Sequence, residues 1–531
     1  MALPYKIRWY RVLHVLIRTV EFYFFRAGNA CLPGNVAENF CAAHKKCASV
    51  AHLKPRFRKE PIMKKALSLF LALLLLTLFT VSCNTQPADS ETSNNGTEGA
   101  ETTAEETDTP PLSIVENGTS QYRVIINDRL SSTLAPSAFK LIDAIKEKTG
   151  AELGAATDFE HPSMPENDAT DYEILIGTTR EGKYCSFDTS DLTELDFRIA
   201  VVGTRVLILG GSTPTTLRAV EYFIKNYLPA EPTSDWSLPA TTNELKLHSS
   251  DSEITVMSLN LLHGYTDHSG KNIYGSEDRV DGENNTVAKR QPRVRELILS
   301  YSPDVIGFQE MSNWHSFLES DTALREAGYR LSRCSKNEKI SIYYNSQKFT
   351  LLESGSIYLT EDPENLPCSV LWNSDGNPRL AHFVRLEVKS TGETFILVNT
   401  HIGFENAVLQ VNQTRVVGEY CQQLADHYGD PVICTGDFNS SYGSEHYTKF
   451  TSLGLMGDTR FLATKGSTGT GSFNGFGSSK LGDYAIDQIM VSKNDWYVYT
   501  YQVDYTMFGK YLYYSDHYAV VAKIALLPRI E

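Results

Sequence analysis

The last third of the sequence contains four short clusters of acidic, amide and imidazole residues, each placed after an apolar, strand-like stretch. Side chains at strand ends are held rigidly and stay open to solvent, so a catalytic constellation can be organised there. The clusters are Asn399-Thr400-His401, Gly436-Asp437-Phe438-Asn439, Ile486-Asp487 and Ser515-Asp516-His517. One such pair arises easily by chance, but four in succession predict a single catalytic site.

Apolar stretches and periodic segments indicate the elements that must position these clusters. Asn260 closes the strand-like stretch 254–260, and Glu310 closes the stretch 303–310. The stretches ahead of the four clusters are residues 395–398, 431–434, 484–486 and, less regularly, 511–514. Apolar residues at helical spacing predict amphipathic helices at 289–301 and 410–427.

The order of these residues resembles that of the endonuclease/exonuclease/phosphatase superfamily, the deoxyribonuclease I-like fold. The resemblance covers roughly residues 250–524. It implies a four-layered α/β sandwich, in which two mixed β-sheets pack face to face with helices outside. The alternation of strands and helices agrees with that architecture. The resemblance also implies a Mg²⁺-dependent phosphoric ester hydrolase.

Hydrolysis of a phosphate ester requires a cation on the phosphoryl oxygens and an activated water molecule. Mg²⁺, with Mn²⁺ as an alternative, prefers oxygen ligands. The resemblance assigns the metal to Asn260, Glu310 and Asp516. It has Asp437 orient and deprotonate the attacking water, while Asn439 donates to the phosphate oxygens.

The resemblance gives the two histidines a role at the scissile phosphate. His401 and His517 would contact it, and Asp487 would pair with His517, fix its tautomer and favour its charged form. Arg379 matches an arginine that approaches the phosphate in several family members. Taken alone, each motif could also be a polar turn or a structural histidine.

Two features of the sequence bear on the substrate, and the first of them is a departure from the family pattern. Ile402-Gly403-Phe404 stands where many members place a polar residue after the histidine, and residues 472–476 resemble a loop of a secreted bacterial subgroup. Trp314 and Trp372 could stack on a base or a sugar, although single tryptophans more often belong to the core.

Length and composition restrict the class of protein. A chain of 531 residues is too long for one core and predicts two or three domains. The formal net charge of −15 argues against a broad electrostatic grip on nucleic acid. Nine cysteines occur without zinc-site spacing, so no thiol chemistry is indicated.

The N-terminal part contains an internal start signal. Residues 63–83 carry a basic head, a short apolar run and Cys83, which resembles a bacterial lipoprotein signal with Cys83 as the lipidated residue. The run is shorter than the roughly 20 residues of a membrane-spanning helix. Residues 1–62 are then a mis-assigned upstream extension or a genuine basic segment, and residues 84–111 form a flexible acidic linker. We expect an extracellular protein anchored to the cell membrane through its N-terminal lipid.

Residues 112–248 predict a small accessory α+β domain ahead of the catalytic domain at 249–531. The Gly-rich loop 210–213 could bind a phosphate at a helix N-terminus, or it could be a turn that needs positive φ. The domain loosely resembles domains found ahead of catalytic domains in secreted glycoside hydrolases, which implies a glycan-associated role.

Three functions compete at this point. The first is a secreted metal-dependent phosphoesterase acting on a phosphodiester or a phosphomonoester, such as a phospholipid or a phosphorylated sugar. The second is an extracellular nuclease acting on DNA or RNA. The third is a non-catalytic surface binding lipoprotein that keeps the fold.

Overall fold

The computed structural model describes residues 110–159, 170–179, 189–263, 285–363, 378–469, 471–477, 484–510 and 512–530. The expected signal segment, Cys83 and most of the acidic linker lie outside these residues, as does Trp372. Within the described ranges, no helix combines the length and the apolar character needed to cross a membrane.

Residues 112–246 form a sheet and a core of their own. The six-stranded sheet has the order β3-β2-β4-β6-β5-β8, with its first four strands parallel and the last two antiparallel to their neighbours. Strands β1 and β7 pair separately. The elements are β1 (Leu112–Val115), β2 (Arg123–Ile126), α4 (Ser131–Thr149), β3 (Gly154–Thr157), β4 (Glu173–Ile176), β5 (Phe197–Val202), β6 (Arg205–Gly210), α5 (Thr213–Tyr227), β7 (Trp236–Leu238) and β8 (Asn243–Lys246).

The Gly-rich loop ahead of α5 closes on itself. Ser212 and Thr215 form a capping box that satisfies the first amides of the helix. A Cβ atom on Gly210 would lie 2.2 Å from the backbone nitrogen of Thr216, and one on Gly211 would lie 1.8 Å from the carbonyl oxygen of Thr193. Neither glycine has positive φ, so the expectation of a positive-φ turn is wrong. Close backbone packing requires these glycines.

From residue 253 onward the strands form two mixed sheets. The seven-stranded sheet has the order β11-β12-β10-β9-β21-β20-β18, and the six-stranded sheet has the order β13-β14-β15-β16-β19-β17. The first contains β9 (Glu253–Asn260), β10 (Val305–Gln309), β11 (Tyr329–Arg333), β12 (Ile340–Asn345), β18 (Ser467–Thr468), β20 (Trp496–Val503) and β21 (Val520–Leu526). The second contains β13 (Phe349–Tyr358), β14 (Leu380–Val388), β15 (Thr394–His401), β16 (Val432–Asp437), β17 (Met456–Asp458) and β19 (Asp487–Ser492).

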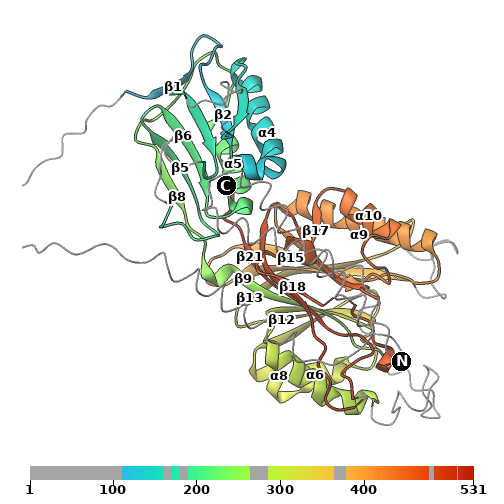
Figure 1. The fold of residues 1–531 in the computed structure, drawn as a ribbon. Coiled ribbons are helices and arrows are strands. Elements are labelled where there is room, and N and C mark those ends of the chain that lie inside the picture. The colour runs from blue at the N-terminus through green and yellow to red at the C-terminus, as the bar shows by residue number, and fades with distance from the viewer. Residues whose placement is uncertain are drawn as a thin grey trace, which may run out of the picture. The chain divides into compact units, whose positions relative to one another are not determined.

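Helices cover the outer faces of both sheets, so the predicted four-layered α/β sandwich is confirmed. Figure 1 shows α9 and α10 along one outer face and α6 and α8 along the other. Alternation along β15 explains the layers: Phe395 and Leu397 enter the core between the sheets, while Ile396 and Val398 pack toward α9. The helices are α6 (Val287–Tyr301), α7 (His315–Ser320), α8 (Thr322–Glu326), α9 (Ala407–Tyr428), α10 (Glu445–Ser452) and α11 (Thr459–Leu462).

A buried polar contact joins the two sheets below the site. The side chain of Asn399 on β15 donates to the carbonyl oxygens of Phe308 at 2.7 Å and Ser341 at 3.1 Å, and accepts from Gln309 at 2.7 Å. Gly307 makes room for this contact, because a Cβ atom there would lie 2.6 Å from the Asn399 amide oxygen. The first residue of the Asn399-Thr400-His401 cluster therefore sets the spacing of the sheets.

Two of the expected strands are wrong. Residues 484–486 are not a strand: β19 begins at Asp487. Residues 512–514 are irregular, and β21 begins only at Val520. In the first case the backbone amides of Ile486 and Asp487 donate to the Ser472 hydroxyl, which holds a turn. In the segment 512–514 the rings of Tyr513 and Tyr514 pack in the core, which accounts for the apolar pattern without a strand.

Candidate active site

Strand pairing places three of the candidate residues side by side on the six-stranded sheet. β15 and β16 are parallel, with His401 opposite Asp437. β16 and β19 are antiparallel, with Asp437 opposite Asp487. All three side chains are buried. The long helix α9 supplies the crossover that lets β15 and β16 end at the same edge of the sheet.

The seven-stranded sheet contributes Asn260 and Glu310 from the ends of the parallel strands β9 and β10. The Asn260 side-chain nitrogen donates to Glu310 at 3.1 Å and to Asp437 at 3.0 Å. Its amide oxygen accepts from the backbone of Leu262 at 3.0 Å. Asn260 therefore links one carboxylate from each sheet.

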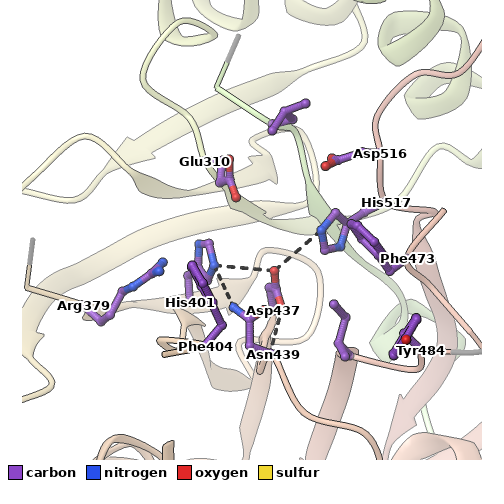
Figure 2. A pocket seen from close by; sticks show the side chains of 12 residues that line it. Glu310, Arg379, His401, Phe404, Asp437, Asn439, Phe473, Tyr484, Asp516 and His517 are labelled. Carbon is purple, nitrogen blue, oxygen red and sulfur yellow. Dashed lines mark hydrogen bonds and ion pairs between the residues drawn. The ribbon is translucent and has the colours of Figure 1, made fainter. Parts of the chain in front are cut away.

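The segment before β21 completes the site. His517 Nδ1 lies 2.8 Å from Asp487 Oδ2, and His517 Nε2 lies 3.8 Å from Asp437 Oδ2. The Ser515 hydroxyl donates to the carbonyl oxygen of Asn260 at 2.6 Å and so fixes this segment to β9. Figure 2 shows Asp437 between the two histidines, with Glu310 and Asp516 farther apart above it.

Asn439 and His401 form the other side of the site. The Asn439 side-chain nitrogen lies 3.2 Å from His401 Nε2 and donates to the Ile402 carbonyl at 2.8 Å. His401 Nε2 lies 3.5 Å from Asp437 Oδ2. Asn439 (φ 47°) and Glu310 (φ 56°) adopt left-handed backbone conformations. Such strained conformations in non-glycine residues concentrate at functional sites.

The pKa values of the two histidines shift in opposite directions. Burial alone would lower the pKa of His517, but its ion pair with Asp487 and the charge of Asp437 raise that pKa well above the ordinary value. Burial and the nearby charge of Arg379 hold the pKa of His401 well below its ordinary value. The site thus pairs a charged imidazole with a neutral one.

The pKa values of two carboxylates at the site, Asp437 and Glu310, also shift in opposite directions. Burial and the neighbouring charge of Asp487 raise the pKa of Asp437 to about 7. Burial is the largest influence on Glu310 and acts to raise its pKa, but the hydrogen bonds from His263 and Asn260 and the nearby imidazoles together outweigh it and keep that pKa below its ordinary value. A carboxylate that titrates near neutral pH is suited to accept a proton during a reaction.

These groups open into a pocket of about 550 Å³. It is lined by Leu262, Glu310, Arg379, His401, Phe404, Asp437, Asn439, Phe473, Tyr484, Ile486, Asp516 and His517. The structure therefore brings Arg379 to the site with the histidines and the carboxylates. Asn260 and Asp487 do not line the pocket and contact the lining residues from behind.

Sequence reasoning missed His263, which follows β9. Its Nδ1 lies 2.5 Å from Glu310 Oε2, and its backbone amide donates to the same oxygen at 3.4 Å. It also missed the structural role of Arg290 on α6, whose buried guanidinium donates to the carbonyl oxygen of Leu262 at 2.9 Å. The only sequence signal for His263 was its position three residues after Asn260. Trp314, by contrast, is a core residue, as expected.

Among the residues that the structure describes, two groups of side chains could hold a cation. Asp437, Asp487 and His517 offer ligand atoms within 4.8 Å of one another. However, the raised pKa of His517 and its contact with Asp487 favour a protonated imidazole, which has no lone pair for a metal. Glu310 and Asp516 present carboxylate oxygens to the pocket, which is the donor type that a hard divalent cation prefers. The Glu310–Asp516 side therefore fits a cation better than the Asp–His group does.

Residues 257–517 match the model of the endonuclease/exonuclease/phosphatase family. This part of the chain carries every site residue described above and belongs to that family, whose name denotes hydrolysis of phosphate esters. No curated protein matches the chain.

Solved structures similar to this chain come from bacteria and from animals. An endonuclease/exonuclease/phosphatase family protein from Bacteroides thetaiotaomicron is 23% identical, with a TM-score of 0.44 over 52% of this chain and 98% of its own. A mannosyl-6-phosphatase from the same species is 25% identical, with a TM-score of 0.43 over 51% and 99%. The catalytic domain of human Nocturnin is 20% identical, with a TM-score of 0.38 over 53% and 96%.

Proposed function

We propose that this protein is a divalent-metal-dependent phosphoesterase that hydrolyses a phosphate ester by attack of water. The observation that carries the proposal is the buried row His401–Asp437–Asp487, closed by His517, at the bottom of a pocket that also contains Glu310. The family match over residues 257–517 supports the same reaction class.

A cation bound at Glu310 and Asp516 would neutralise charge on the phosphoryl oxygens. Asp437 accepts the proton of the attacking water, because its carboxylate lies at the bottom of the pocket between both histidines. Asn439 and His401 donate hydrogen bonds to the phosphate from one side, and Arg379 adds a positive charge.

His517 acts from the other side of the phosphate. The buried Asp487 holds the imidazole through Nδ1 at 2.8 Å, so that Nε2 points toward Asp437 and the pocket. A charged imidazole in this orientation stabilises negative charge on the oxygens in the transition state. Asn260 and Ser515 keep the two sheets and the 515–517 segment in position.

The decisive experiment is an ester panel with the protein in Mg²⁺, Mn²⁺ or EDTA. The panel holds plasmid DNA, RNA, sphingomyelin, phosphoinositides, sugar phosphates and nucleotides. We expect turnover of one class with metal, loss of turnover with EDTA, and loss with Asp437→Ala. Full activity of Asp437→Ala would reject the assigned mechanism. Metal binding without turnover of any ester would favour a binding protein that keeps the fold.

We further propose that the enzyme acts outside the cell, anchored by lipid at Cys83, and that residues 84–111 are its tether. The support is the sequence of residues 63–83 alone. Mass spectrometry of the mature N-terminus tests the proposal: a lipid-modified Cys83 is expected. A mature protein that retains residues 1–62 would reject it.

A further inference from the structure

The pocket has apolar as well as charged lining residues. Leu262, Phe404, Phe473, Tyr484 and Ile486 line it together with the catalytic side chains. The Phe473 ring lies edge-on to His517, with centroids 5.1 Å apart, and 6.3 Å from the Tyr484 ring. Figure 2 shows Phe404 on the His401 side of Asp437 and Phe473 with Tyr484 on the His517 side. A phosphate held at Asp437 therefore has aromatic rings on both sides.

The outermost two rings are largely open to water. Phe404 is 62% exposed and Tyr484 is 52% exposed, so most of their apolar area remains to be buried by a ligand. Aromatic faces gain most from a flat or ring-shaped partner that packs in an offset or edge-on geometry. A sugar ring and a nucleobase both present such a surface, whereas a short acyclic alcohol does not.

The charges of the pocket limit the number of phosphates it can hold. Its lining includes the carboxylates Glu310, Asp437 and Asp516, and Arg379 is the one arginine or lysine among the described lining residues. A polyanion is held through many cationic contacts, and the chain as a whole carries a formal charge of −15. A pocket of about 550 Å³ lies within the range typical of small-molecule sites.

We propose that this pocket selects a small phosphate ester of a ring-bearing alcohol, a sugar phosphate or a nucleoside phosphate, and that Phe404 and Tyr484 bind the ring. The inference rests on the phosphoesterase function proposed above. In the reaction the phosphorus–oxygen bond to that alcohol breaks, a phosphorus–oxygen bond to water forms, and the leaving alkoxide takes up a proton.

Steady-state kinetics of the full chain tests the role of the two rings. The substrates are a hexose 6-phosphate, a nucleoside 5′-monophosphate and the acyclic glycerol 3-phosphate. Phe404→Ala and Tyr484→Ala should each raise KM for ring-bearing esters about two- to tenfold and leave KM for glycerol 3-phosphate unchanged. The larger of the two ring-bearing effects identifies a sugar or a nucleoside as the source.

Two exposed aromatic residues away from the pocket supply matched controls. Phe461 is 62% exposed and Tyr442 is 50% exposed, which equals or nearly equals the exposure of Phe404 and Tyr484. Phe461→Ala and Tyr442→Ala should leave KM for every ester unchanged. Equal effects of Phe404→Ala on ring-bearing and acyclic esters would overturn the proposal, as would higher kcat/KM for an oligonucleotide than for any small ester.

Calorimetry separates failure of this inference from failure of the proposed function. Asp437→Asn protein is titrated with the same three esters, which it binds without hydrolysis. Asp437→Asn protein should bind the ring-bearing esters more tightly than the acyclic one, and the double variant Asp437→Asn/Phe404→Ala should lose this difference. Such a result supports ring recognition even if the wild type hydrolyses none of the esters. Turnover by the wild type combined with equal binding of cyclic and acyclic esters would retain the phosphoesterase and reject the ring-binding role.

Discussion

The region 112–246 and the sandwich that follows it place buried carboxylates in opposite electrostatic environments. In the first region Glu173 is fully buried and accepts hydrogen bonds from Arg123 at 2.8 Å and Arg205 at 3.2 Å. In the sandwich Asp437 and Asp487 stand opposite each other on neighbouring strands, and burial together with the charge of Asp487 raises the pKa of Asp437. Oppositely charged partners stabilise a fold, whereas carboxylates gathered together store energy that a substrate or a cation can release.

The same contrast extends to backbone donors. Asp196 accepts from the backbone amides of Thr193 at 2.7 Å and His248 at 2.8 Å, so both of its oxygens have partners. The Oδ1 atom of Asp487, by contrast, has no hydrogen-bond partner among the described residues. A strand-end acid is therefore a candidate for chemistry where local donors leave it incompletely satisfied.

The largest effect is expected from neutralising the sandwich carboxylate. Asp437→Asn should lower kcat about 10³-fold because the acceptor of the water proton is lost. Its melting temperature should stay constant or rise, because the repulsion with Asp487 is removed. Kinetics and thermal melting check both halves. A large fall in melting temperature would show that Asp437 supports the fold rather than the reaction.

The matching substitution in the region 112–246 should lower stability and leave catalysis nearly unchanged. Glu173→Gln leaves Arg123 and Arg205 without their carboxylate and should cost about 3 kcal/mol of unfolding free energy. Urea unfolding measures this loss, while kcat of the folded protein should remain within about twofold of the wild type. A strongly reduced kcat at full folding would remove the distinction between the two regions.

Much of the site was accessible from sequence because parallel pairing brings strand ends together. Asn260 and Glu310 end β9 and β10, and His401 and Asp437 end β15 and β16, so adjacency follows once the strands are recognised. Asp487 was placed correctly as a partner of His517, although it begins its strand rather than following one.

The contacts that sequence reasoning missed depend on how distant segments pack. The contact of His263 with Glu310 requires the loop after β9 to fold over the end of β10. Asn399 reaches across to the other sheet because Gly307 has no side chain. Tyr513 and Tyr514 give their segment an apolar character because their rings enter the core, not because they form a strand. No local pattern carries such information.

A buried histidine of the sandwich, His382, should make the stability of the protein depend on pH. His382 on β14 contacts the hydroxyls of Ser332 at 3.0 Å and Ser356 at 2.9 Å, and burial lowers its pKa from 6.5 to about 4. The unfolded chain takes up this proton first as the pH falls. His382 should therefore remove about 2–3 kcal/mol of stability between pH 6.5 and pH 4.

Urea unfolding at pH 7 and pH 4.5 tests this prediction with His382→Gln as the comparison. The variant keeps a polar side chain but cannot take up a proton in this range. It should lose less stability than the wild type on acidification, by about 2 kcal/mol. Identical losses in both proteins would mean that His382 titrates at the same pH in the folded and unfolded states.

The smallest predicted effect concerns His263, which holds Glu310 from the open side of the site. A hydrogen bond to a ligating carboxylate fixes its orientation, and removing such a partner typically costs ten- to a hundredfold in metal affinity. Because the His263 side chain is 42% exposed, we expect the lower end, about tenfold, for His263→Ala. Titration with Mn²⁺, followed by electron paramagnetic resonance without substrate, measures the affinity.

His427, an exposed residue near the end of α9, provides the control for a histidine removed elsewhere. His427→Ala should bind Mn²⁺ like the wild type, and His263→Gln, which can still donate a hydrogen bond, should fall between the wild type and His263→Ala. Tighter binding by His263→Ala would reverse the interpretation. It would show that His263 competes with the cation for Glu310 Oε2. Without a cation Glu310 would then resemble Glu173, whose oxygens are already paired with side chains of the protein.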